Sequence, residues 1–121
     1  MTSTTLNLPV LQDLDGFRIE VDADRERGDI ILDRAPMNVI SMAERDQLRL
    51  AFEALDSDDS VRVIVLRAEG ENFSSGGYIK GFLDASPENV SHLAENVAAP
   101  WRCAKPVIVA NKGYTLSLIH I

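Results

Sequence analysis

The stretch Val61-Arg62-Val63-Ile64-Val65-Leu66, followed after a short loop by Phe73-Ser74-Ser75-Gly76-Gly77-Tyr78-Ile79-Lys80, decides how this chain folds. Its first part is β-branched and nearly continuous, which is typical of a strand covered on both faces in a parallel sheet. Two consecutive glycines let the backbone turn sharply and approach a ligand closely. Amides at the start of a following helical turn can bind an oxygen that becomes negative. A glycine pair is also the ordinary choice for a turn without any ligand.

The segments before this stretch predict a hairpin and a helix. Residues 17–22 alternate apolar and polar side chains, and residues 29–33 form a second strand after a charged turn, which favours an antiparallel hairpin. Ser41 followed by Glu44 fits a capping box at a helix start. An apolar helix face follows at helical spacing and consists of Leu48, Ala51, Phe52 and Leu55.

The segments after the glycine pair predict a second helix and another strand. Ser86-Pro87-Glu88 has the proline of a helix start. We expect Ala98-Ala99-Pro100 to end or kink that helix, and residues 107–110 to form a buried strand. The apolar face of the helix would consist of Val90, Leu93, Ala94 and Val97. The elements together predict an α/β protein.

The composition sets limits on size, compartment and partners. The chain has 121 residues, which suits one small domain or part of a larger one, and its formal net charge is -7. An acidic balance argues against nucleic acid or an anionic membrane as the main partner. A single cysteine excludes an intramolecular disulfide, and the N-terminal residues lack the pattern of a secretory signal. No apolar run approaches the ~20 residues that span a bilayer, so we predict a cytoplasmic protein.

Three segments, taken in order, resemble the crotonase (enoyl-CoA hydratase/isomerase) family. Residues 73–80 are similar to the family pattern Phe-x-x-Gly-x-Asp-Leu/Ile-Lys. Residues 33–40, Asp-Arg-Ala-Pro-Met-Asn-Val-Ile, resemble its Asn-Arg-Pro…Leu-Asn-Ala-Leu loop. Residues 105–114 resemble its Lys-Pro-Val-Ile-Ala…Asn-Gly strand. The resemblance implies an α/β, crotonase-like (ClpP/crotonase) ββα spiral fold, of which this chain would hold the N-terminal half.

The resemblance also implies a reaction and a site. The family adds water to, or isomerises, an enoyl-CoA thioester through an oxyanion-stabilised enolate, and coenzyme A enters as part of the substrate without a separate cofactor or metal. Gly77 would donate one of two oxyanion-hole amides. Tyr78 departs from the family's Asp, which leaves the subfamily open. The implied substrate-binding residues are Met37, Val39, Ser75, Gly76, Gly77, Tyr78, Ile79 and Lys80.

The family pattern stops at Thr115. The family continues x-x-Gly-x-Gly-x-Glu, whereas this chain continues Thr-Leu-Ser-Leu-Ile-His-Ile, so Leu118 stands in place of the second amide donor and Ile121 in place of the first glutamate. We therefore predict a poorly ordered arm (1–16), a partial hydratase/isomerase domain (17–114) and a non-family tail (115–121). The tail is either a sequencing artefact on a truncated gene or part of a genuine short protein. We expect this chain to lack useful hydratase activity.

Other functions remain open. The chain could be a non-catalytic module that binds acyl-CoA or a protein partner, or a family member that hydrolyses acyl-CoA. Ser74 and Ser75 lack the first glycine of a Gly-x-Ser-x-Gly elbow and an identifiable base, which argues against a serine hydrolase. The histidines and the cysteine lie at no spacing typical of zinc ligands. The resemblance implies an acyl-CoA partner and a parent homotrimer or hexamer, whose assembly elements lie mostly outside this chain.

Single residues outside these motifs receive structural interpretations. We expect His92 to lie at the surface and Cys103 to pack as a small apolar side chain. We expect Trp101 to pack against a neighbouring element.

Overall fold

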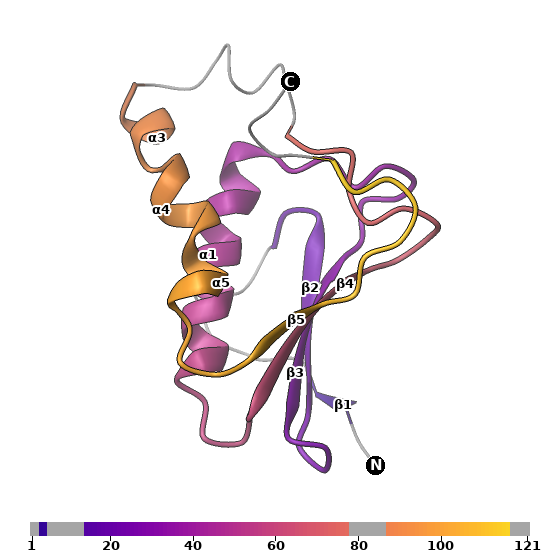
Figure 1. Ribbon diagram of the computed structural model, residues 1–121, viewed down its shortest axis with the longest axis vertical. Helices are drawn as coiled ribbons and strands as arrows, with labels where there is room; N and C mark the ends of the chain where they lie inside the picture. Colours follow the sequence, from indigo (N-terminus) through magenta and orange to yellow (C-terminus); the bar gives the residue numbers. More distant parts are fainter. Residues whose placement is uncertain (1–2, 5–13, 78–86, 117–121) are drawn as a thin grey trace.

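The protein is an α/β domain in which one sheet is accompanied by helices that pack beside it (Figure 1). The computed structural model describes residues 3–4, 14–77 and 87–116. The sheet has the spatial order β1-β2-β3-β4-β5. Its strands are β1 (Ser3–Thr4), β2 (Phe17–Asp22), β3 (Arg27–Leu32), β4 (Val63–Ala68) and β5 (Val107–Val109). The helices are α1 (Met42–Asp56), α3 (Pro87–Ser91), α4 (Leu93–Val97) and α5 (Ala99–Arg102).

The strand pairings define a ββα unit. β2 and β3 form the predicted antiparallel hairpin, with Phe17 opposite Leu32 and Asp22 opposite Arg27. β3 then pairs in parallel with β4, and β4 in parallel with β5, so α1 is the crossover between β3 and β4. The predicted α/β class and hairpin are confirmed. β4 begins two residues later than predicted, because Val61 is buried against the core and the Arg62 N–H donates to the Glu26 carbonyl at the hairpin turn.

Helix α1 has the start and end that its sequence predicts. Ser41 is the N-cap, and its hydroxyl accepts a hydrogen bond from the Glu44 N–H at 3.0 Å. In a full capping box the Glu44 carboxyl would accept a hydrogen bond from the Ser41 N–H. Here the buried Glu44 carboxyl instead pairs with Arg34 at 3.3 Å. At the other end, the Lys105 Nζ donates to the Leu55 carbonyl at 2.8 Å, which places a cation where the helix dipole favours one.

The core lies between α1 and the sheet. The predicted apolar face of α1 is confirmed, since Ala51, Phe52 and Leu55 are buried and Leu48 packs against them. The strands supply the opposite side of this core with Phe17, Ile19, Val21, Ile30, Leu32 and Ile64. Burial of this kind is the main favourable contribution to folding.

The segment after residue 86 is broken into short helices, which corrects the prediction of one continuous helix. Pro100 lies in the first turn of α5 instead of ending a helix, a position that suits a residue without an N–H. The break between α3 and α4 falls at His92, which is exposed as predicted. Ala94 is exposed, contrary to its predicted place on an apolar face, whereas Val97 is partly buried. The predicted start at Ser86 lies outside the described residues.

The β5 edge of the sheet is open to solvent in this chain, so the prediction of a buried strand is wrong here. Ile108 is 54% exposed and Val109 is 48% exposed, because within the described residues β5 pairs only with β4 and no element covers its other side. Trp101 is 91% exposed, so its predicted packing is also wrong. Tyr114 and Leu116, which follow β5, are also exposed.

Parts of the predicted N-terminal arm contact the domain. Ser3 and Thr4 form β1 and pair in antiparallel fashion with β2. Leu14 packs against the core, and the Asp15 N–H donates to the Gln47 side chain at 2.7 Å. The rest of the arm lies outside the described residues.

The burial of α1 gives a direct stability test. We expect Leu55→Ala to lower the free energy of unfolding by about 2–5 kcal/mol, because it removes a fully buried side chain and leaves a cavity. Leu116→Ala is the matched control, since Leu116 is 56% exposed and should change little. Urea unfolding followed by circular dichroism measures both. Equal effects of the two substitutions would contradict this assignment of the core.

Candidate functional site

Three loops meet at one edge of the sheet. They follow β3 (residues 33–40), β4 (residues 69–77) and β5 (residues 110–116), and Figure 1 shows them side by side beyond the strand ends. These three strands are mutually parallel, so their carboxyl ends lie at the same edge. Ligands of open α/β sheets bind characteristically beyond the carboxyl ends of strands. Each loop is one of the segments singled out in the sequence.

The loop after β4 is joined to the loop after β3 by main-chain hydrogen bonds. The Ser75 N–H donates to the Met37 carbonyl at 2.8 Å, and the Ile40 N–H donates to the Gly76 carbonyl at 2.9 Å. The buried Ser74 hydroxyl donates to the Asn38 carbonyl at 2.7 Å and accepts from the Gly76 N–H at 3.0 Å. The structure thus brings together Met37, Ser75 and Gly76, three of the residues that the resemblance implied for the substrate site.

Asn38 holds these two loops together, a role that was not predicted. Its backbone has φ of 48°, in the left-handed region that asparagine tolerates better than most residues. Its side-chain amide donates to the Asn72 carbonyl at 2.9 Å and to the Glu69 carbonyl at 3.3 Å. An asparagine directly after a proline-containing loop was the available signal for such a turn.

The loop after β5 completes the site from the other side. The Ser74 N–H donates to the Tyr114 carbonyl at 2.9 Å, and the Leu116 N–H donates back to the Ser74 carbonyl at 3.0 Å. Gly113 has φ of 54°, and a Cβ at this position would lie 2.3 Å from the Glu71 carbonyl oxygen. Only glycine therefore allows the two loops to approach this closely.

The Gly76–Gly77 peptide is oriented by these contacts. Gly76 has φ of 101°, which glycine adopts readily, and its carbonyl oxygen faces Ile40. The N–H of the same peptide belongs to Gly77 and points to the opposite side, since the peptide is trans. Among the residues that the structure describes, none accepts a hydrogen bond from this N–H. The predicted residues Tyr78, Ile79 and Lys80 lie outside the described part of the chain.

Comparison with known proteins identifies the family. The family model for enoyl-CoA hydratase/isomerase matches residues 28–117, which include the three loops just described. The chain belongs to the enoyl-CoA hydratase/isomerase (crotonase) family. No curated protein sequence matches the chain.

Solved crotonase-family structures have the same fold. An enoyl-CoA hydratase from Shewanella pealeana is 19% identical with a TM-score of 0.74, over 86% of this chain and 42% of that one. An enoyl-CoA hydratase/carnithine racemase from Magnetospirillum magneticum is 26% identical with a TM-score of 0.71, over 87% and 42%. DspI of Pseudomonas aeruginosa is 21% identical with a TM-score of 0.73, over 90% and 43%. This chain thus spans about two fifths of their length, corresponding to the N-terminal part of the crotonase fold.

Arg34 fixes the remaining predicted residue of the crotonase site, Val39. Its Nη1 donates to the Val39 carbonyl at 3.1 Å and lies 3.3 Å from the Glu44 carboxyl, while its Nη2 pairs with Asp15. Arg34, Val39 and Asp15 line a hollow together with Ser41. Burial raises the pKa of Glu44 to about 8, although the nearby Arg34 acts in the opposite direction.

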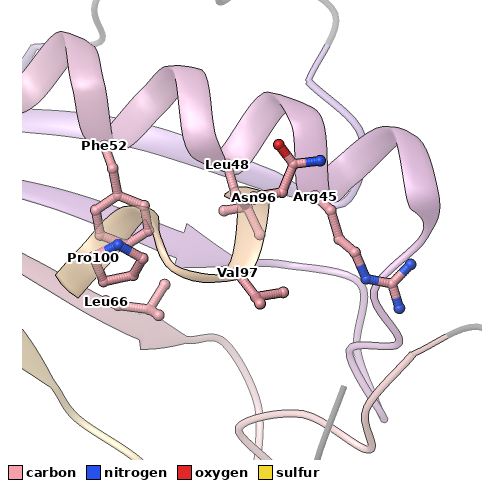
Figure 2. A pocket seen from close by; sticks show the side chains of 7 residues that line it. All are labelled: Arg45, Leu48, Phe52, Leu66, Asn96, Val97 and Pro100. Atoms are coloured by element: carbon pink, nitrogen blue, oxygen red, sulfur yellow. The ribbon is translucent and has the colours of Figure 1, made fainter. Parts of the chain in front are cut away.

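A second cavity lies between α1, α4, α5 and β4, away from the predicted site (Figure 2). It has a volume of about 80 Å³. Figure 2 shows apolar side chains facing one another across it, with the Arg45 guanidinium extending beyond one end. None of the described substrate-site residues lines this cavity, which is formed by Arg45, Leu48, Phe52, Leu66, Asn96, Val97 and Pro100.

Within the described ranges, no group of three or more His, Cys, Asp or Glu side chains is placed to hold a metal ion. None of the described helices has the length and apolar character needed to cross a membrane.

The buried Glu44 carboxyl predicts a pH dependence of stability. Its pKa is raised from 4.5 to about 8, so folding favours the protonated form. This contribution to stability is fully present below the ordinary pKa and is lost as the pH rises through about 8. We expect the free energy of unfolding, measured in urea, to fall over that range, and Glu44→Gln to flatten the fall.

The control for this experiment is Glu53→Gln, which removes an exposed carboxylate from the same helix. It should leave the pH dependence of the parent chain in place. If Glu44→Gln and Glu53→Gln gave the same pH profile, the assignment of the titration to Glu44 would be wrong.

Proposed function

We propose that this chain provides an acyl-CoA half-site of the crotonase type, in which the Gly77 amide donates a hydrogen bond to the thioester carbonyl oxygen. The orientation of the Gly76–Gly77 peptide carries this proposal. Its carbonyl is held by Ile40, and its N–H faces away from the loops without a described acceptor. The family match supports an enoyl-CoA thioester as the ligand, as do the names of two of the similar structures, which are called enoyl-CoA hydratases.

The chemistry requires a donor that is already in place. When an enoyl-CoA gains a nucleophile or shifts its double bond, the thioester carbonyl becomes an enolate and its oxygen acquires negative charge. A preorganised amide stabilises that charge more than it stabilises the neutral carbonyl, which is how such a donor accelerates a reaction. The hydrogen bonds on both sides of Gly76 supply the preorganisation, because they fix the loop before any ligand arrives.

The resemblance also implies a binding role for the main chain beside Gly77. We propose that the backbone at Met37, Val39 and Ser75 contacts the pantetheine and adenine, as the family resemblance implies, and that Lys80 meets a phosphate. Coenzyme A then enters with the substrate, and no separate cofactor is needed. For the parent protein we propose a cytoplasmic lyase of fatty acid metabolism that forms homotrimers or hexamers.

The expected activity of the 121-residue chain is binding without useful turnover. The register of the sequence places Leu118 and Ile121 where the family has the second amide donor and a glutamate. Loss of one oxyanion donor typically lowers the rate by about 10²–10³. Loss of acid–base groups typically lowers it by about another 10²–10⁴. A hydrolase reaction through Ser74 is less well supported, because this hydroxyl is buried and already bonded to Asn38 and Gly76.

A proline at position 77 tests the amide directly. Gly77→Pro removes the N–H, whereas Gly77→Ala retains it and introduces the residue that is commoner in the family. We expect Gly77→Pro to weaken crotonyl-CoA binding by about tenfold relative to Gly77→Ala, which corresponds to one hydrogen bond of about 1.4 kcal/mol. Isothermal titration calorimetry of the 121-residue chain measures both affinities.

Free coenzyme A is the control ligand, since it lacks the thioester carbonyl and should bind both variants with similar affinity. Circular dichroism spectra establish that both variants fold. If the unmodified chain binds neither crotonyl-CoA nor coenzyme A, the proposed half-site is incorrect. If crotonyl-CoA binds both variants equally, the Gly77 amide is not the donor.

A further inference from the structure

Two peptide groups lie in series between Arg34 and the Gly77 amide. The Arg34 Nη1 donates to the Val39 carbonyl oxygen at 3.1 Å. The N–H of that same peptide group belongs to Ile40, and it donates to the Gly76 carbonyl oxygen at 2.9 Å. The N–H at the far end of the second peptide group is that of Gly77. A positive charge is therefore connected to the candidate oxyanion donor by consecutive hydrogen bonds.

Peptide groups connected in this way polarise one another. Both are trans, so in each the C=O and the N–H point in opposite directions. A cation at one carbonyl oxygen withdraws electron density from that peptide and strengthens its N–H as a donor. Chains of hydrogen bonds pass such polarisation on, with an estimated strengthening of about 10–30% per bond. The Gly77 N–H at the end of the series therefore becomes more positive, and it binds a negatively charged oxygen more strongly.

The neighbours of Arg34 hold the guanidinium in place and leave its Nη1 in contact with the Val39 carbonyl. Asp15 pairs with Nη2, and Glu44 lies 3.3 Å from Nη1. Because burial raises the pKa of Glu44 to about 8, this carboxyl is mainly protonated at neutral pH. The adjacent Asp33 carboxylate pairs with Arg18 at 3.3 Å instead. Arg34 thus contacts Asp15 through Nη2 and the Val39 carbonyl through Nη1, so the two contacts use different nitrogens.

We propose that Arg34 is a positioning residue of the thioester site, which orients and polarises the two peptide groups that end in the Gly77 N–H. The ligand in this inference rests on the proposed function, whereas the polarised amide is a property of the free protein. Arg34 itself touches no substrate. Its effect is to make Gly77 a stronger hydrogen-bond donor than an ordinary main-chain amide.

If Arg34 had only a structural role, its hydrogen bond to the Val39 carbonyl would matter and its positive charge would not. Two substitutions separate these roles. Arg34→Lys retains the positive charge with a different donor, and Arg34→Gln retains an N–H donor without the charge. Arg62→Gln is the matched control, because Arg62 is an exposed arginine next to the other end of β4 and pairs with Glu26.

The first measurement is the ¹H–¹⁵N spectrum of the free 121-residue chain. We expect Arg34→Gln to shift the Gly77 amide proton upfield, Arg34→Lys to leave it near its original position, and Arg62→Gln to have no effect. An unmoved Gly77 proton in a folded Arg34→Gln chain would overturn the inference. Equal shifts in Arg34→Gln and Arg34→Lys would also overturn it, since they would indicate a purely structural role.

The unmutated chain provides a second measurement that does not depend on the folding of any variant. As the pH rises through about 8, Glu44 ionises and adds negative charge beside Arg34. The polarisation should weaken, and the Gly77 amide resonance should shift upfield with that titration. A Gly77 resonance that does not follow it contradicts the relay.

The third measurement adds crotonyl-CoA labelled with ¹³C at the thioester carbonyl. A strong donor lowers the stretching frequency of the bound carbonyl, so the infrared shift on binding should be smaller in Arg34→Gln than in Arg34→Lys. Equal infrared shifts overturn the inference. Absence of binding to the unmodified chain counts against the proposed function alone, because the two preceding measurements still test the relay in the free protein.

Discussion

The hydrogen bond from the Ile40 N–H to the Gly76 carbonyl is the contact on which the candidate site depends. It joins residues that are 36 positions apart, and it sets the direction of the peptide whose other end is Gly77. It forms because β3 and β4 are parallel neighbours, so the loops that follow them start from the same edge of the sheet. The ββα topology thus orients the Gly76–Gly77 peptide through contacts within the chain itself.

The same topology leaves the edge strand β5 exposed to solvent. β4 also pairs in parallel with β5, and within the described residues no strand pairs with the other edge of β5. Ile108 and Val109 on β5 and Trp101 on α5 are exposed large apolar side chains. The similar crotonase structures are more than twice as long as this chain, which is consistent with further structure covering this face in those proteins.

Local sequence patterns predicted the elements whose contacts are local. The alternation of residues 17–22, the Ser41 cap and the apolar face ending at Leu55 each appear in the structure where expected. The glycine pair lies after β4, as expected, whereas its contacts with the loop that holds Met37 were not predicted. The errors concern contacts made by the rest of the fold: β5 and Trp101 look buried from composition, yet burial depends on a covering element. Pro100 was compatible with ending one helix or starting another, and packing against α1 selected the second.

The pairing of Arg34 with Glu44 shows why the electrostatics of the site could not be predicted from the sequence. Each residue alone has an ordinary interpretation, one as a loop cation and the other as half of a capping box. Only the fold turns the Glu44 carboxyl inward, where desolvation raises its pKa, and brings Arg34 to the Val39 carbonyl. Burying a carboxyl group is unfavourable unless the group has a hydrogen-bonding or charged partner. Here it anchors the cation that holds the loop after β3, and so couples the start of α1 to the orientation of the Gly77 amide.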